Sequence, residues 1–313
     1  MIVAGVDVGG TGVKIGLVDE GHKVMARSKE ATPQKGPDAL IAAIAKQIAG
    51  FDKKPAAVGV GIPGAVSRGE IIQVPNLPNW PADFEFRKTL EKKLGVPVAL
   101  GNDVNVGLLG EWLAGAAKGA ANVLGVWMGT GIGGGLILDG RPYDGMRGAA
   151  GEIGHMVVRA DGALCGCGRR GCVEAYAGRR MMSETAHARQ AAGRKTSLFE
   201  IQDEEDKERL TSKVWAEALE KGDAVATEIF DEAIAALGLG IGSVLNLLDL
   251  ERVVIGGGFA ERMGKKLAER IEAAARPRVM APNPKLKYVA ASLGDDSGIV
   301  GAAALARALV IKS

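Results

Sequence analysis

All three cysteines of the chain lie in one glycine-rich stretch that also contains a histidine. His155, Cys165, Cys167 and Cys172 form the pattern H-x9-C-x-C-x4-C. Three thiolates and one imidazole suit a closed tetrahedral Zn²⁺ site, which leaves no open position for catalysis. Three cysteines cannot all pair in disulfides, and a polar loop is a poor place for cysteines that serve only as core residues. The pattern therefore predicts a structural zinc site.

Two carboxylates flank this loop. Glu152 lies three residues before the histidine, and Glu174 lies two residues after the last cysteine. Because a metal-bound loop holds its ends in fixed positions, we expect both acids to face a polyhydroxylated ligand.

Three glycine segments follow apolar runs that read as strands. They are D-x-G-G-T-x-x-K at Asp7–Lys14, G-T-G-I-G-G-G at Gly129–Gly135, and Gly256–Gly258. Adjacent glycines let backbone N–H groups converge on an anion with no Cβ in the way. The first segment adds a hydroxyl, a cation and, at Asp7, a carboxylate suited to a water of Mg²⁺. We predict phosphate contacts at the first two segments and an adenosine contact at the third; an ordinary turn is the alternative for each.

Gly129–Gly134 also satisfies the G-x-G-x-x-G expression of dinucleotide sites. That fingerprint requires a helix next, whereas Leu136–Leu138 continues as a strand. A nicotinamide-dependent oxidoreductase is therefore a disfavoured alternative.

Asn102 and Asp103 lie where a predicted strand meets a predicted helix, an edge at which α/β sheets place reactive groups. Asp103 as a helix N-cap is the alternative. Beside glycine segments suited to a nucleotide, we predict Asp103 to be the general base of a phosphoryl transfer. Asn76 lies in a proline-rich loop expected near the same edge, where its amide is suited to sugar hydroxyls.

The composition is that of a globular protein with two domains or one large α/β unit. The net charge is +2 with acids and bases interspersed, which indicates no nucleic acid or anionic membrane as a partner. The uncharged runs Gly119–Leu138 and Ala233–Leu248 contain glycines and polar residues, so neither is expected to span a membrane. Clustered cysteines, and an acid at Asp7 that interrupts any apolar leader, favour a cytoplasmic location.

Periodicity and turn residues predict a series of α/β elements. Helices are expected at Pro37–Gly50, Phe84–Leu94, Val104–Gly115, Lys265–Ala275, Ser297–Leu309 and across Glu174–Leu248 with one interruption near Gly193–Ser197. Strands are expected at Met1–Asp7, Val13–Val18, Lys23–Ser28, Val58–Ile62, Val96–Leu100, Val123–Met128, Gly135–Leu138, Arg252–Ile255 and Tyr288–Ala291. A strand, a glycine turn and a second strand occur twice, at Ile2–Val18 and Val123–Leu138, which indicates duplicated α/β domains.

Together these motifs resemble the ROK family (repressors, open reading frames and sugar kinases), and within it the ATP-dependent bacterial glucokinases. The resemblance runs nearly end to end. Besides the glycine segments it rests on N-D-x-N at Asn102–Asn105, E-x-G-H at Glu152–His155, and C-G-C-G-R-R-G-C-V-E at Cys165–Glu174. Two departures, Asn79 where glycine is frequent and Gly101 where an acid is frequent, bear on sugar preference more than on kinase activity.

The resemblance implies an actin-like ATPase fold of two RNase H-like domains around a central cleft. We expect one domain at 1–117 plus 298–313 and a larger one with the zinc loop at 118–297. The resemblance also implies ATP, Mg²⁺, structural Zn²⁺, and a homodimer or homotetramer.

Residue roles follow from the same resemblance. Asp103 is the expected base. The expected sugar-binding set is Asn76, Asn102, Asp103, Glu152, His155 and Glu174. The expected nucleotide-binding set is Asp7, Gly9, Gly10, Thr11, Lys14, Gly129, Thr130, Gly131, Gly256, Gly257 and Gly258.

The predicted function is ATP-dependent phosphorylation of the 6-hydroxyl of a hexose, with glucose preferred. A kinase for another sugar is the nearest alternative: fructose, mannose, N-acetylmannosamine or N-acetylglucosamine. A sugar-binding regulator without kinase activity is less favoured, because the first predicted strand begins at Ile2 and leaves no room for a DNA-binding helix-turn-helix.

Overall fold

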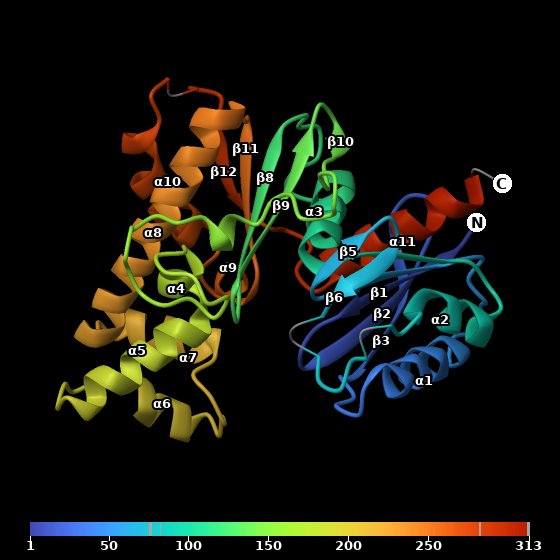
Figure 1. Cartoon of the computed structure of the whole chain (residues 1–313), viewed down its shortest axis with the longest axis horizontal. Helices are drawn as coiled ribbons and strands as arrows, with labels where there is room; N and C mark the ends of the chain where they lie inside the picture. The colour runs from blue at the N-terminus through green and yellow to red at the C-terminus, as the bar shows by residue number, and fades with distance from the viewer. Residues whose placement is uncertain (75–76, 82, 282, 312–313) are drawn as a thin grey trace. The chain divides into compact units, whose positions relative to one another are not determined.

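The computed structural model describes residues 1–74, 77–81, 83–281 and 283–311, so Asn76 lies outside the described residues. The chain groups into two units (Figure 1). The first consists of Met1–Ala121, Gly135–Ala150 and Ser292–Ser313, and the second of Asn122–Gly134 and Gly151–Ala291. Gly135–Ala150, expected in the larger domain, thus groups with the first unit. The domain boundaries at 117/118 and 297/298 stay a prediction.

A five-stranded sheet forms the centre of the first unit, in the order β3 (Val24–Ala31), β2 (Gly12–Val18), β1 (Val3–Val8), β4 (Val58–Ile62) and β7 (Val98–Asn102). β1 pairs antiparallel with β2 and parallel with β4, and β4 pairs parallel with β7. The predicted strand–hairpin–strand start is confirmed.

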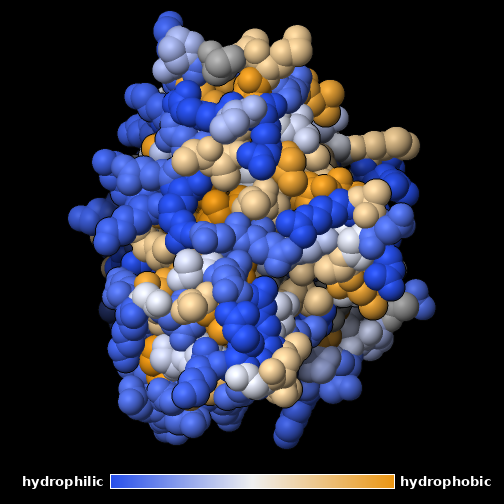
Figure 2. All heavy atoms as spheres, turned by 90° about the vertical axis from the view of Figure 1, so that its left-hand side faces the viewer, coloured by the Kyte–Doolittle hydropathy of each residue, from blue (hydrophilic) through white to orange (hydrophobic). Residues whose placement is uncertain are grey.

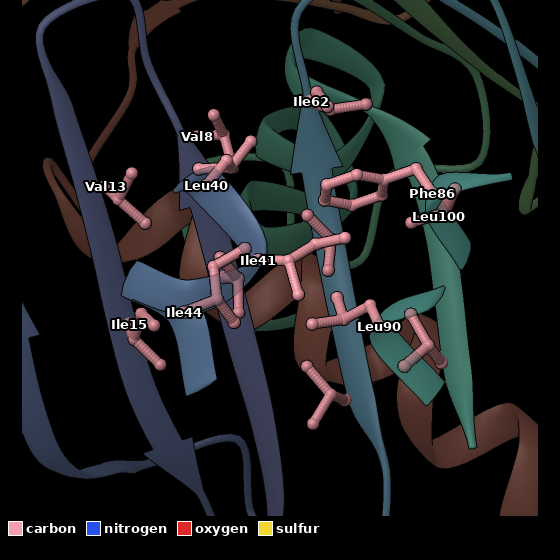
Figure 3. Close-up of a cluster of buried hydrophobic side chains, with 14 of the residues drawn as sticks. Val8, Val13, Ile15, Leu40, Ile41, Ile44, Ile62, Phe86, Leu90 and Leu100 are labelled. Carbon is pink, nitrogen blue, oxygen red and sulfur yellow. The ribbon is translucent and has the colours of Figure 1, made fainter. Parts of the chain in front are cut away.

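The two faces of this sheet are covered by different helices because successive side chains of a strand point to opposite faces. Ala4, Val6 and Val8 of β1 join a core cluster with residues of α1 (Pro37–Ala49) and α2 (Phe86–Leu94). Figure 3 shows Ile44, Phe86, Leu90 and others of this cluster between the helices and the strands. Ile44, Phe86 and Leu90 are each at most 1% exposed.

On the other face, α11 (Asp296–Ile311) packs directly on the sheet backbone. A Cβ added to Gly5 would lie 1.9 Å from the carbonyl oxygen of Ile299, and one added to Gly59 would lie 1.8 Å from that of Ala302. α3 (Asp103–Ala114), which begins with the predicted base, packs beside α11, and both helices contact β4 and β7.

The second sheet has the order β10 (Arg141–Pro142), β9 (Ile132–Leu138), β8 (Val123–Met128), β11 (Arg252–Gly256) and β12 (Lys287–Ala290). β9 begins at Ile132, earlier than predicted, and it is the strand that argued against a dinucleotide fingerprint. In the same sheet, β11 pairs parallel with both β8 and β12.

The predicted helical region 174–248 contains five helices separated by four breaks, where the sequence indicated one interruption. They are α4 (Glu174–Ala177), α5 (Arg179–Ala191), α6 (Leu198–Glu204), α7 (Ser212–Glu220) and α8 (Ala224–Leu248). Capping side chains mark two of the starts: Thr211 accepts from the N–H of Val214, and Asp223 from that of Ala226. The remaining elements are β5 (Ala65–Ser67), β6 (Glu70–Gln73), α9 (Gly258–Met263), α10 (Lys265–Ala275) and the 3-10 turns Ile153–His155 and Arg276–Arg278.

Hydrophilic side chains predominate on the face drawn in Figure 2, and apolar ones gather there only in small groups. Within the described ranges, every helix is too short or too polar to cross a membrane.

Candidate active site

The parallel strands β1, β4 and β7 end at one edge of the first sheet. In their register, Asp7 lies opposite Gly61 and Ile62 lies opposite Asn102. The carboxyl ends of parallel strands are where α/β sheets place their ligands. The Gly9–Thr11 turn and Asp103 directly follow these ends, so the structure brings the two predicted groups to the same edge.

Asn102 is the N-cap of α3. Its side-chain oxygen accepts from the N–H groups of Val104 and Asn105 at 2.9 and 3.1 Å, and its amide nitrogen donates to Gly64 O and to Asp103 Oδ1, both at 2.9 Å. The alternative interpretation of Asp103 as the cap is therefore wrong: Asn102 caps the helix, and Asp103 is its first residue.

Asp103 has a strongly perturbed carboxyl group. Burial, with a further contribution from the charge of Asp7, raises the pKa of Asp103 to about 6, against the opposing N–H groups of Val104 and Asn102. A carboxylate with this pKa is mostly ionised at neutral pH, yet it is a stronger base than an ordinary aspartate. This is the property that a general base for a hydroxyl needs.

Lys14 connects two acids beside Asp103. It lies opposite Asp7 in the β1–β2 ladder, and its Nζ is 3.7 Å from Asp7 Oδ2 and 2.8 Å from Asp295 Oδ1. Burial raises the pKa of Asp7, although Lys14 opposes the shift, and Lys14 lowers the pKa of Asp295. A Cβ added to Gly298 would lie 2.6 Å from Asp7 Cγ, so the first turn of α11 leaves room for this carboxylate.

Sequence reasoning missed Asp295 and also Glu111, which is completely buried. Glu111 Oε1 accepts from the N–H groups of Ser292 and Leu293 at 3.0 and 2.8 Å, and its Oε2 accepts from that of Ala116 at 2.8 Å. These bonds fix the segment that leads into Asp295. The sequence contains one weak signal for each residue. Glu111 is a single acid in an apolar predicted helix, and Asp295 belongs to an Asp-Asp pair just before the last predicted helix.

The first glycine turn is fixed by its neighbours but leaves open space. Gly9 donates its N–H to Gly12 O at 2.9 Å, and Thr32 Oγ1 donates to Gly9 O at 2.6 Å. A Cβ added to Gly10 would meet no described atom within 4 Å, and the φ of Gly10 is not positive. Folding therefore does not require glycine at this position. The open space leaves room for the phosphate contact predicted from the sequence.

The space for an added Cβ also differs between the other two glycine segments, Gly129–Gly135 and Gly256–Gly258. A Cβ on Gly129 would meet only Gly131 O, at 4.0 Å, so this position is also open. At Gly256 the added atom would lie 2.4 Å from the Trp127 ring, and Gly257 has a φ of 84°. Packing and backbone conformation account for the glycines at the third segment, so their identity gives no support to an adenosine contact there, which stays a prediction.

The predicted zinc ligands lie together. The ligand atoms of His155, Cys165, Cys167 and Cys172 are all within 4.8 Å of one another. His155 Nδ1 is 3.9 Å from Cys165 Sγ, and the sulfurs of Cys167 and Cys172 are 3.8 Å apart. Burial raises the pKa of Cys165 and of Cys172, so a cation is needed to hold them as thiolates. This donor set fits Zn²⁺.

Glu174 connects this loop to the glycine turn at Gly129–Gly131. It is the first residue of α4, its Oε2 accepts from the N–H of Ile132 at 2.9 Å, and its Oε1 lies 3.8 Å from Cys165 Sγ. Glu152 is exposed and directly precedes the turn that carries His155.

Both departures from the family pattern have local causes. Asn79 has a φ of 56°, a left-handed conformation that glycine and asparagine tolerate best. A side chain at Gly101 would lie 2.8 Å from Leu305 of α11 and 3.0 Å from Val106, so packing disfavours an acid there.

Known proteins resemble the chain over almost its whole length. A family model described as ROK family matches residues 3–309. A glucokinase of Halalkalibacterium halodurans is 34% identical over 314 residues, covering 95% of this chain and 92% of that protein. An N-acetyl-D-glucosamine kinase of Photobacterium profundum is 33% identical over 318 residues, covering 96% and 98%.

A solved structure also resembles the chain over almost its whole length. A ROK family glucokinase from Streptomyces griseus, in complex with glucose and AMPPNP, has a TM-score of 0.86 at 32% identity, covering 98% of this chain and 100% of that one. This likeness confirms the predicted actin-like ATPase fold. Because the family model spans nearly the whole sequence and full-length relatives exceed 30% identity, the chain belongs to the ROK family.

Proposed function

We propose that the protein transfers the γ-phosphoryl group of ATP to the 6-hydroxyl of a hexose, with glucose as the preferred acceptor. The observation that carries this proposal is the Asp103 carboxyl group, which follows β7 at the sheet edge and has a pKa raised to about 6. A group of this kind can orient a sugar hydroxyl and take its proton as the bond to phosphorus forms.

The remaining groups bind and orient the phosphates. Backbone N–H groups at the open glycine positions Gly10 and Gly129 are suited to phosphate oxygens, and Lys14 adds a positive charge. Asp7 offers a partly exposed carboxylate, an oxygen ligand of the kind that Mg²⁺ prefers, and is the residue we expect to hold it. Mg²⁺ bound with the nucleotide offsets negative charge on the phosphates.

The zinc loop has a supporting role in this proposal. Zn²⁺ on His155 and the three cysteines holds the loop, and the loop in turn presents Glu152, His155 and Glu174 to the sugar hydroxyls. Asn76 and Asn102 complete the proposed sugar-binding set. A cytoplasmic location and a homodimer or homotetramer belong to the same proposal and rest on the family resemblance.

A kinase for another hexose or an N-acetylhexosamine is the second candidate, and the N-acetyl-D-glucosamine kinase among the relatives favours it. Hexoses differ by one or two hydroxyl contacts, often worth only ~1–3 kcal/mol, so related sites separate them weakly. A sugar-binding regulator is third.

A coupled assay of ADP release over a panel of hexoses and N-acetylhexosamines, with ATP as donor, tests the proposal. We expect the wild type to have its highest kcat/KM with glucose, and Asp103→Asn to release ADP at a rate lower by on the order of 10²-fold or more. A higher kcat/KM for an N-acetylhexosamine would select the second candidate. Sugar binding without ADP release would select the regulator.

A further inference from the structure

The guanidinium of Arg179 lies between the two glycine segments of the second unit. Arg179 is the first residue of α5, and its Nη2 donates to Thr130 Oγ1 at 3.0 Å while its Nη1 donates to Ser212 Oγ at 2.9 Å. A Cβ added to Gly258 would lie 3.9 Å from the same Nη1. The side chain therefore reaches both segments for which the sequence predicts nucleotide contacts.

No acid neutralises this cation among the residues that the structure describes. Arg179 is partly buried, and its side chain donates to two hydroxyl groups, those of Thr130 and Ser212. Burial lowers the pKa of Arg179, and the like charge of Arg209 lowers it further. Arg180, by contrast, is exposed and lies 3.8 Å from Glu184. A partly buried charge without a counter-charge is costly, and a bound anion would remove that cost.

The backbone fixes Arg179 relative to the glycine turn. The N–H of Arg179 donates to Gly129 O and the N–H of Arg180 donates to Thr130 O, both at 3.1 Å. Carbonyl oxygens already accept hydrogen bonds from these first N–H groups of α5. The group that remains to bind an anion is therefore the guanidinium of Arg179 and not the helix N-terminus. The open space at Gly129 lies in the same turn.

We propose that Arg179 binds the phosphate chain of the nucleotide at the Gly129–Gly131 turn. The assignment rests on the proposed function, because it takes ATP as the ligand. A guanidinium donates through a planar fork that matches two phosphate oxygens at once. Thr130 and Ser212 hold that fork through its hydroxyl contacts, so little ordering is left for the binding step.

Isothermal titration of ATP and of adenosine into the wild type, Arg179→Met and Arg179→Lys tests the assignment. Arg180→Met is the matched control, because it removes a cation from the same helical turn. We expect Arg179→Met to weaken ATP binding about 10- to 100-fold, the range for a lost charge-assisted hydrogen bond. The ATP affinity of Arg179→Lys should lie between those of the wild type and Arg179→Met. The Kd for adenosine should be the same in all three proteins. Inorganic tripolyphosphate should displace ATP from the wild type.

Equal ATP affinity of the wild type and Arg179→Met would overturn the assignment and leave the kinase proposal standing. A tenfold loss that extends to adenosine, or that Arg180→Met shares, would also overturn it. A wild type that binds ATP through Arg179 but phosphorylates no sugar would refute the proposed function alone. Thermal unfolding checks each variant, and we expect Arg179→Met to melt near the wild type because no ion pair is lost.

Discussion

Replacing Asp103 by asparagine should greatly lower kcat and make the protein more stable. The native structure raises the pKa of this carboxyl from 3.8 to about 6, mainly through burial. An acid with a raised pKa binds more protons in the folded state than in the unfolded state, so its contribution to stability decreases as the pH rises from about 4 to about 6. A shift of this size corresponds to about 3 kcal/mol at neutral pH.

Asparagine has the shape of the protonated acid and no charge to bury. Asp103→Asn should therefore raise the free energy of unfolding by up to about 3 kcal/mol at pH 7–8, and by only about 1 kcal/mol at pH 4.5. Its side-chain oxygen can still accept from the N–H groups of Val104 and Asn102. kcat should decrease by on the order of 10²-fold or more, as expected for a lost general base.

Urea unfolding of both proteins across this pH range measures the stability difference, and the ADP assay measures kcat. Asp38→Asn is the matched control, because Asp38 is an exposed acid in the first turn of α1, as Asp103 is in the first turn of α3. Loss of the Asp38 charge at the start of α1 should lower the free energy of unfolding by ~0.3–1 kcal/mol, whereas Asp103→Asn should raise it. A stability gain that is absent, or that is equal at pH 4.5 and pH 8, would refute the argument that burial of Asp103 raises its pKa.

Three further predictions concern the same groups. In the wild type, kcat/KM for the sugar should fall about tenfold per pH unit below pH 6 as Asp103 is protonated, and a flat profile between pH 5 and 7 would contradict this assignment. Glu111→Gln places an amide NH₂ group opposite buried N–H donors, so it should lower the free energy of unfolding by ~3 kcal/mol. Hydrogen exchange at Ser292 and Leu293 should become faster. Unchanged exchange would show that the carboxylate does not hold this segment. Cys167→Ser should abolish zinc binding, measured by metal analysis, and weaken sugar binding together with stability. Undiminished sugar affinity in the zinc-free variant would separate the loop from the sugar site.

The sequence predicted those parts of the fold and site that are encoded locally. Apolar runs of five to seven residues gave the positions of β1, β2, β4 and β8 to within two residues or better. The cysteine spacing gave the metal cluster because ligand type and spacing nearly suffice to define such a site. The hairpin β5–β6 was missed, since its short strands follow a proline and a glycine and carry no clear alternation.

Residues that act through distant partners could not be predicted in this way. Glu111 holds Ser292 across 181 positions of the chain, and Lys14 meets Asp295 across 281. In the sequence, Arg179 is one of several arginines in a polar predicted helix. Its hydrogen bonds to Thr130 and Ser212 and its partial burial, which only the structure shows, distinguish it from Arg180. Their roles depend on which backbone segments the fold brings together.

The glycines show why residue type alone was an incomplete guide. Three glycine segments of the sequence were predicted to be sites of ligand approach, yet glycine also permits close packing of backbones. At Gly5 and Gly59 a helix occupies the space of the missing side chain, and at Gly256 a tryptophan ring does. At Gly10 and Gly129 that space stays open. The argument for a phosphate ligand is therefore strongest at these two turns, and at the second of them the structure also supplies a cation without a counter-charge among the described residues.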